Sequence, residues 1–107
     1  MDISVIIVNW RSAEYLKACL ASLRLALDGL HAEVIVIDNA SHDGSAEAVR
    51  ATCPGATFIQ SKENLGFAGA NNAAACGAHG RTLLFLNPDT EVEPPAVRRL
   101  LDAIDGN

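Results

Sequence analysis

Four short apolar runs recur along the chain, and each gives way to polar residues. Ile3 to Val8, Glu33 to Ile37 and Leu83 to Leu86 are almost unbroken apolar stretches. Runs of this length are too short for lone helices and predict strands buried on both faces, as in a parallel sheet. A weaker run, Ala56 to Ile59, predicts a further strand between the last two.

The segments between these runs have the features of helices. The first begins near Ala13 with Ser12 as its N-cap, and Asp28-Gly29 ends it. Its apolar stripe has helical spacing and consists of Leu16, Leu20, Leu23 and Leu27. The loop that opens the second helix offers three capping side chains, Ser41, Asp43 and Ser45. The remaining predicted helices end near Ala51, cover Phe67 to Gly80, and cover Pro95 to Ile104.

Strands and helices therefore alternate, which predicts an α/β fold with a Rossmann-like parallel sheet and helices on both faces. Right-handed crossovers, with the fourth strand beside the first, give the strand order 3-2-1-4. Asn9, Asp38 and Asp89 then follow the carboxyl ends of their strands. Ligands bind outside such ends at the switch point of the sheet. We expect Asn9 and Asp89 to flank that crevice, with Asp38 one strand away.

Composition narrows the possible partners. The 107 residues are half apolar and carry a net charge of −5 without a basic block, which argues against nucleic acid and anionic membranes as ligands. No apolar run is long enough to span a membrane, and the acidic start at Asp2 does not resemble a signal peptide. Three widely spaced cysteines predict free thiols in a reducing cytoplasm rather than disulfides or zinc.

Four motifs in order resemble the N-terminal half of family 2 glycosyltransferases, most closely their rhamnosyltransferase-like group. The motifs are SVIIVNW, VIVIDNASHDGS, NLGFAGANNAA and LLFLNPDTEV. The resemblance implies a GT-A fold and an inverting enzyme that uses a nucleotide-sugar donor. It also implies that residues 1–107 are the nucleotide-sugar-binding part of a longer domain and lack the acceptor-binding half.

The resemblance assigns site residues. Asp38 would accept a hydrogen bond from the N3–H of uracil or thymine, since an ionised carboxylate only accepts. Asp89 would bind a divalent metal, Mg²⁺ or Mn²⁺, at the position of the family's DxD motif, where Asn87 replaces the first aspartate. The remaining nucleotide-binding residues would be Val8, Asn9, Trp10, Asn64 and Gly66, together with Asn87.

The same resemblance implies the reaction. The donor would be a dTDP- or UDP-sugar, with dTDP-rhamnose favoured, and the acceptor a saccharide or a lipid-linked acceptor. The general base would lie outside this chain, so we expect the 107 residues to bind nucleotide but to transfer little or no sugar. The full-length protein would work in the cytoplasm at the inner face of the membrane. An exposed sheet edge at strand three or four would favour self-association.

The sequence is weighed against two other functions, of which the first stays open. Asp38 and Asp89 are also common turn and capping residues, so the chain could be a non-catalytic nucleotide-binding module. A receiver-like signalling domain is disfavoured. It would need acidic residues after the first strand and a lysine after a late one, whereas Asn9-Trp10-Arg11 follow the first strand and no lysine occurs after Lys62.

Overall fold

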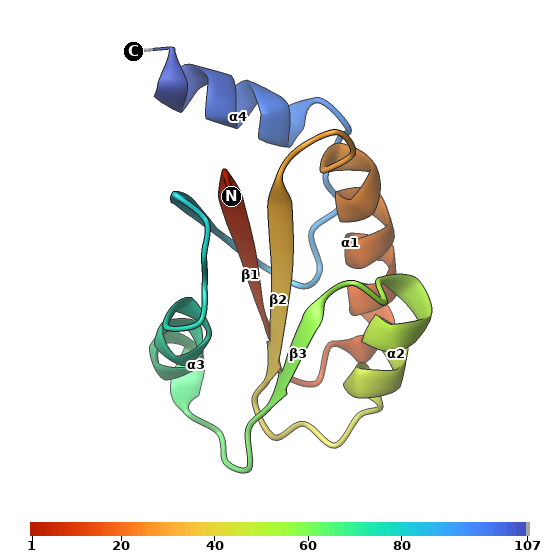
Figure 1. Cartoon of the computed structure of the whole chain (residues 1–107). Helices are drawn as coiled ribbons and strands as arrows, with labels where there is room; N and C mark the ends of the chain where they lie inside the picture. Colours follow the sequence, from red (N-terminus) through yellow and green to blue (C-terminus); the bar gives the residue numbers. More distant parts are fainter. Residues whose placement is uncertain (107) are drawn as a thin grey trace.

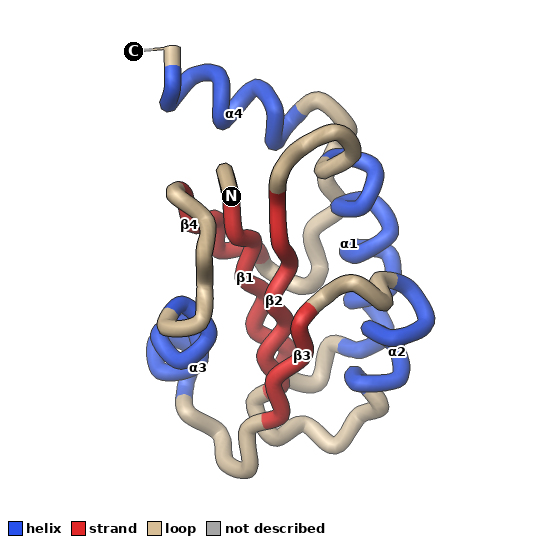
Figure 2. The backbone as a smooth tube through the Cα atoms, in the orientation of Figure 1, coloured by secondary structure: helices blue, strands red, loops and turns tan. Residues whose placement is uncertain are grey.

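A four-stranded parallel sheet forms the centre of the molecule (Figures 1 and 2). The computed structural model describes residues 1–106. The strand order is β3-β2-β1-β4 and every pairing is parallel, which confirms the predicted topology. The strands are β1 (Ile3–Asn9), β2 (Ala32–Asp38), β3 (Thr57–Gln60) and β4 (Thr82–Leu86).

Helices cover both faces of this sheet, as the alternating pattern predicts. One face carries α1, α2 and α4, and the other carries α3 (Figure 1). Side chains alternate along β1, so that Val5 and Ile7 pack beneath α1 while Ile6 and Val8 pack beneath α3. The helices are α1 (Ala13–Ala26), α2 (Ser45–Thr52), α3 (Gly66–Ala75) and α4 (Ala96–Asp105).

The helix predicted over Phe67 to Gly80 is shorter in the structure. α3 ends at Ala75, and the following residues lead back to the start of β4. Its alanines do bring it close to the sheet, because Ala70 and Ala74 are completely buried against β1 and β2. Gly80 lies outside the helix and instead passes directly against the backbone of β1.

The prediction that β4 is buried on both faces is wrong for one of them. Leu84 and Leu86 pack on the α1 face, whereas Leu83 is 40% exposed and Phe85 is 49% exposed. The reason is that α3 packs on β1 and β2 and leaves β4 uncovered. An unbroken apolar run therefore marks a strand but does not show how many of its faces are covered.

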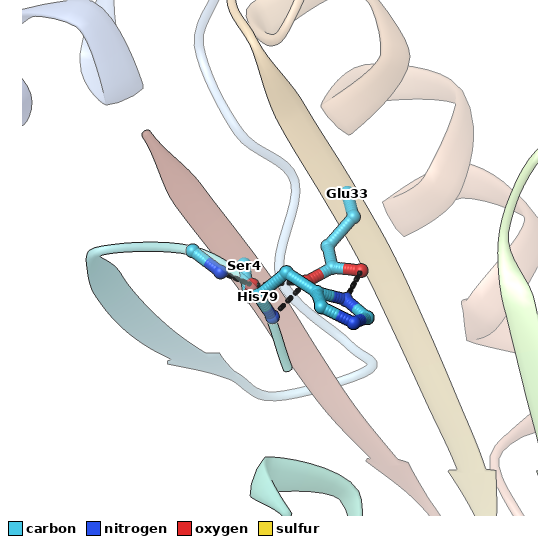
Figure 3. A network of polar contacts seen from close by, with 4 residues as sticks. Ser4, Glu33 and His79 are labelled. Atoms are coloured by element: carbon cyan, nitrogen blue, oxygen red, sulfur yellow. Dashed lines mark hydrogen bonds and ion pairs between the residues drawn. The ribbon is translucent and has the colours of Figure 1, made fainter. Parts of the chain in front are cut away.

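A polar cluster ties the α3–β4 connection to the sheet (Figure 3). Ser4 of β1 donates to the Glu33 carboxylate of β2 and accepts a hydrogen bond from Gly80 N–H at 2.8 Å. The backbone N–H of His79 donates to the same carboxylate at 2.6 Å, and its ring Nδ1 lies 3.4 Å from Glu33 Oε1. Burial alone would raise the pKa of Glu33, but these hydrogen bonds outweigh it and hold that pKa below its usual value.

We expect Glu33→Gln to reduce the free energy of unfolding by about 1–2 kcal/mol at pH 7, since it weakens hydrogen bonds to a charged group. A lowered folded-state pKa means that this contribution is present above the ordinary pKa of glutamate and is lost as the pH falls through the folded-state value. Urea unfolding between pH 7 and pH 3 should therefore show a shallower acid loss in Glu33→Gln. Glu47→Gln, on an exposed pair with Arg50, is the control. Identical pH curves for Glu33→Gln and the unchanged chain would contradict this role.

Candidate functional site

A cleft of about 390 Å³ lies at the carboxyl ends of β1, β2 and β4. The three strand tips thus meet at one site, as their order in the sheet predicts. Five of the predicted nucleotide-binding residues line it: Val8, Trp10, Asn64, Gly66 and Asn87. Ser12, Asn39, Phe67 and Pro88 complete the lining.

Two exposed aromatic rings contribute to this cleft from different elements. Trp10 follows β1 and is 49% exposed, while Phe67 lies in the first turn of α3 and is 63% exposed. The Arg11 guanidinium covers the Trp10 ring at 4.8 Å from its centroid. Large exposed rings in a cleft provide flat apolar surfaces for a planar ligand. Nothing in the sequence marks Phe67 as a site residue, because an aromatic residue in a helix usually packs in the core.

Asn39 fixes the loop that forms one wall of the cleft. Its side chain accepts a hydrogen bond from Leu65 N–H at 2.7 Å and donates one to the Gly66 carbonyl at 3.1 Å. Gly66 has a φ of +76°, a left-handed conformation that glycine adopts without strain. Asn64 completes the turn by accepting the Gly66 N–H at 2.8 Å. The loop that leads into α3 is therefore held in place before any ligand arrives.

Asn9 and Asp38 are not among the residues that line the cleft. Both occupy the positions of their strands that face α1 and α2, whereas Val8 faces α3. Asn9 therefore does not flank the crevice as predicted, because strand alternation turns its side chain away from it. It is fully buried and donates to Asp38 Oδ1 at 2.8 Å.

The Asp38 carboxylate accepts hydrogen bonds from three sides and is 1% exposed. Besides Asn9, the Ser41 N–H donates to Oδ2 at 3.1 Å and Gln60 Nε2 donates to Oδ2 at 2.9 Å. Burial by itself would raise the pKa of Asp38, but the hydrogen bonds from Asn9, Gln60 and Ser41 hold it below its ordinary value. Asp38 is therefore an ionised acceptor at neutral pH.

Asp43 organises the backbone around this carboxylate. It accepts hydrogen bonds from the Ala13 N–H that begins α1 and from the Ser45 N–H that begins α2. Ser12 occupies the N-cap position of α1 but makes no side-chain capping bond, so the predicted capping role belongs to Asp43. The surrounding loops contain three non-glycine residues with positive φ, which are Arg11, Ala40 and His42. Such conformations concentrate at functional sites.

Asp89 follows β4 and is exposed to solvent outside the lining of the cleft. The pKa of the buried Cys19 thiol is raised to about 11, mainly by burial and further by the negative charge of Asp89. Residues 1–106 contain no group of three or more histidine, cysteine, aspartate or glutamate side chains that could hold a metal ion. A single carboxylate suits Mg²⁺ or Mn²⁺ where substrate phosphates and water supply the remaining ligands.

Comparisons with known proteins agree with this geometry. Residues 4–107 match the family model described as glycosyl transferase family 2. The succinoglycan biosynthesis protein ExoO of Rhizobium meliloti is 31% identical over 105 residues, which cover 97% of this chain and 30% of ExoO. S. aureus TarS in complex with UDP-GlcNAc superposes with a TM-score of 0.90 at 26% identity, covering 99% of this chain and 32% of that one. The mannosyltransferase PcManGT from Pyrobaculum calidifontis, solved with GDP-Man and Mn²⁺, superposes with a TM-score of 0.79 at 30% identity. That match covers 95% of this chain and 31% of PcManGT.

The chain belongs to glycosyl transferase family 2, and its α/β fold matches that of GT-A glycosyltransferases. It spans about a third of the length of these curated relatives and solved structures. Within residues 1–106, no helix is both long enough and apolar enough to cross a membrane.

Proposed function

We propose that this chain binds the nucleoside diphosphate of a sugar donor in the cleft at the ends of β1, β2 and β4. The observation that carries the proposal is that residues from three separate motifs, Trp10, Asn64 and Asn87, line one cleft together with the exposed ring of Phe67. Val8 and Trp10 would face the base and ribose, and Asn64, Gly66 and Asn87 would face the phosphates. Asp38 would accept the N–H of a uracil or thymine base.

Asp89 would hold the divalent metal. Bound there, Mg²⁺ or Mn²⁺ would neutralise the charge of the diphosphate leaving group. The residues of this chain would hold the base and ribose and orient the donor. Transfer would invert the anomeric centre and deliver the sugar to a saccharide or lipid-linked acceptor, from a dTDP- or UDP-sugar such as dTDP-rhamnose. The three free cysteines support a cytoplasmic location.

Titration calorimetry with UDP and with dTDP, each with and without Mn²⁺, tests this proposal. We expect both nucleotides to bind more tightly with the metal. Asp89→Asn should weaken binding in Mn²⁺ at least about ten-fold, because even the partners of metal ligands contribute that much to metal affinity. Glu91→Gln, an exposed acidic residue two positions later, should behave like the unchanged chain. Equal affinity of Asp89→Asn in the presence of Mn²⁺ would remove Asp89 from the site.

A sugar-transfer assay on the same chain separates a donor-binding half from a complete enzyme. Transfer that accompanies metal-dependent binding would show that the 107 residues catalyse the reaction. Binding without transfer would support a nucleotide-binding unit that needs further residues. Absence of nucleotide binding in all four titrations would contradict the proposed function.

We also propose that two copies of this chain pair through β4. Among residues 1–106, β4 has a single hydrogen-bonded neighbour, β1, so its other edge is free. A two-fold axis at Leu84 would place Leu83 of each copy opposite Phe85 of the other, and such aliphatic–aromatic pairs stabilise antiparallel strands. Phe85→Asp should therefore lower the average mass in light scattering at high concentration. Leu25→Asp, on exposed α1 surface, should not. A monomeric unchanged chain would contradict the pairing.

A further inference from the structure

Three polar side chains form a row across the ends of three strands. Asn9 of β1 is the register partner of Asp38 of β2, which is in turn the partner of Gln60 of β3. Amide groups thus flank the Asp38 carboxylate on both sides, with donor–acceptor distances of 2.8 Å and 2.9 Å. If Asp38 reads a nucleobase, a ligand must reach a carboxylate that this row and its loops leave only 1% exposed.

The two flanking amides differ in their freedom to move. Asn9 is fully buried, and its Nδ2 group donates to both Asp38 and Asp43. This orientation leaves Asn9 Oδ1 as the buried side-chain atom without a hydrogen-bond partner among residues 1–106. Gln60, in contrast, is exposed at the end of the four-residue edge strand β3. Its Nε2 group also donates to the Ser61 carbonyl at 2.9 Å, in an exposed contact that water can replace. Gln60 is therefore the side chain that can leave Asp38 at the smallest cost.

Access to the Asp38 carboxylate points to the same side chain. Its Oδ1 accepts a hydrogen bond from Asn9, which is fully buried, so this oxygen lies on the closed side. Its Oδ2 accepts from the Ser41 N–H and from the exposed Gln60, and a carboxylate oxygen accepts about two hydrogen bonds, so a ligand that arrives from the exposed side needs the place of Gln60. The carboxamide of Gln60 presents an N–H beside a C=O, which is the pattern of the N3–H and C4=O edge of uracil and thymine. It makes with Asp38 the contact that such a base would make.

We propose that Gln60 occupies on Asp38 the position that the N–H of the base takes in the complex, so that binding displaces its carboxamide into solvent. This inference rests on the proposed function of the cleft and adds a residue to it. A ligand must then break the Gln60 hydrogen bond before it makes its own. Only a base that offers an N–H at this edge replaces what is lost, whereas the unprotonated N3 of cytosine leaves Asp38 short of a donor.

Gln60→Ala should therefore tighten UDP binding by about two- to ten-fold, the range that corresponds to the net contribution of one hydrogen bond. The same variant should unfold at a lower temperature without ligand, because the free protein has lost that bond. In the Asp38→Ala background, Gln60→Ala should leave the UDP affinity unchanged. Calorimetry on these variants, with Thr57→Ala on the same edge strand as the control, measures each effect.

The possible results separate the two proposals. Weaker or unchanged UDP binding in Gln60→Ala, together with a loss of affinity in Asp38→Ala, would overturn the displacement and leave the proposed function standing. It would show that Gln60 positions Asp38 or does not affect it. Unchanged affinity in Asp38→Ala would overturn the displacement and the role of Asp38 in reading the base, while nucleotide binding by the chain would stand. No UDP binding by the unchanged chain, with or without Mn²⁺, would overturn both proposals.

Discussion

Gly80→Ala should destabilise the chain by about 2–4 kcal/mol, although it adds a single methyl group. A Cβ atom at this position would lie 2.4 Å from the backbone nitrogen of Ser4 and 2.5 Å from the carbonyl carbon of Ile3. These atoms belong to the fully buried start of β1 and cannot move without disturbing the central strand. The substitution would also displace the Gly80 N–H from its hydrogen bond to Ser4.

Gly55→Ala is the matched control for this effect. Nothing lies within 4 Å of a Cβ atom built at Gly55, and its φ is not in the left-handed region. Alanine there should be neutral or stabilise the chain by less than about 1 kcal/mol, since it restricts the unfolded chain. Urea unfolding of both variants measures the difference. If the two variants have the same free energy of unfolding, the close approach of Gly80 to β1 does not constrain the fold.

The sheet could be predicted from the sequence because each strand is marked by a short run of consecutive apolar residues. Nearly unbroken apolar runs such as Ile3 to Val8, separated by helical segments, predict parallel strands without knowledge of any contact. The strand order follows once right-handed crossovers are combined with a fourth strand placed beside the first. The strand tips then meet at one cleft as a consequence of topology. Coverage of the sheet depends instead on where α3 packs, and Phe85 is exposed for that reason.

The polar contacts of the site could not be predicted in the same way. Asn39 and Gln60 act on residues that are brought near them by packing, 26 and 22 positions away in sequence. An asparagine after a strand and a glutamine on an edge strand are both ordinary surface residues in a sequence. Strand alternation, which does follow from the pattern, could have shown that Asn9 and Val8 face opposite sides of the sheet.

Asp43→Ala should reduce the free energy of unfolding by about 2–3 kcal/mol. One carboxylate accepts the Ala13 N–H at 3.1 Å and the Ser45 N–H at 3.2 Å, so the substitution removes the side-chain acceptor at the start of both α1 and α2. Each capping bond contributes about 1 kcal/mol. The buried Asn9 amide also loses an acceptor at 3.2 Å, which adds to the cost.

Glu47→Ala is the control for Asp43→Ala, because it removes an acidic side chain near the start of α2 that caps neither helix. Glu47 also lies in the first turn of α2, but it pairs with the exposed Arg50 at 3.4 Å. Its loss should therefore change stability by less than about 0.5 kcal/mol. Hydrogen exchange should locate the difference, because Asp43→Ala removes protection from the Ala13 and Ser45 amides together. Equal stability of the two variants would mean that water replaces the carboxylate at both helix starts. Loss of protection at one helix alone would show that the other start is held by its own packing, and that Asp43 does not couple the two.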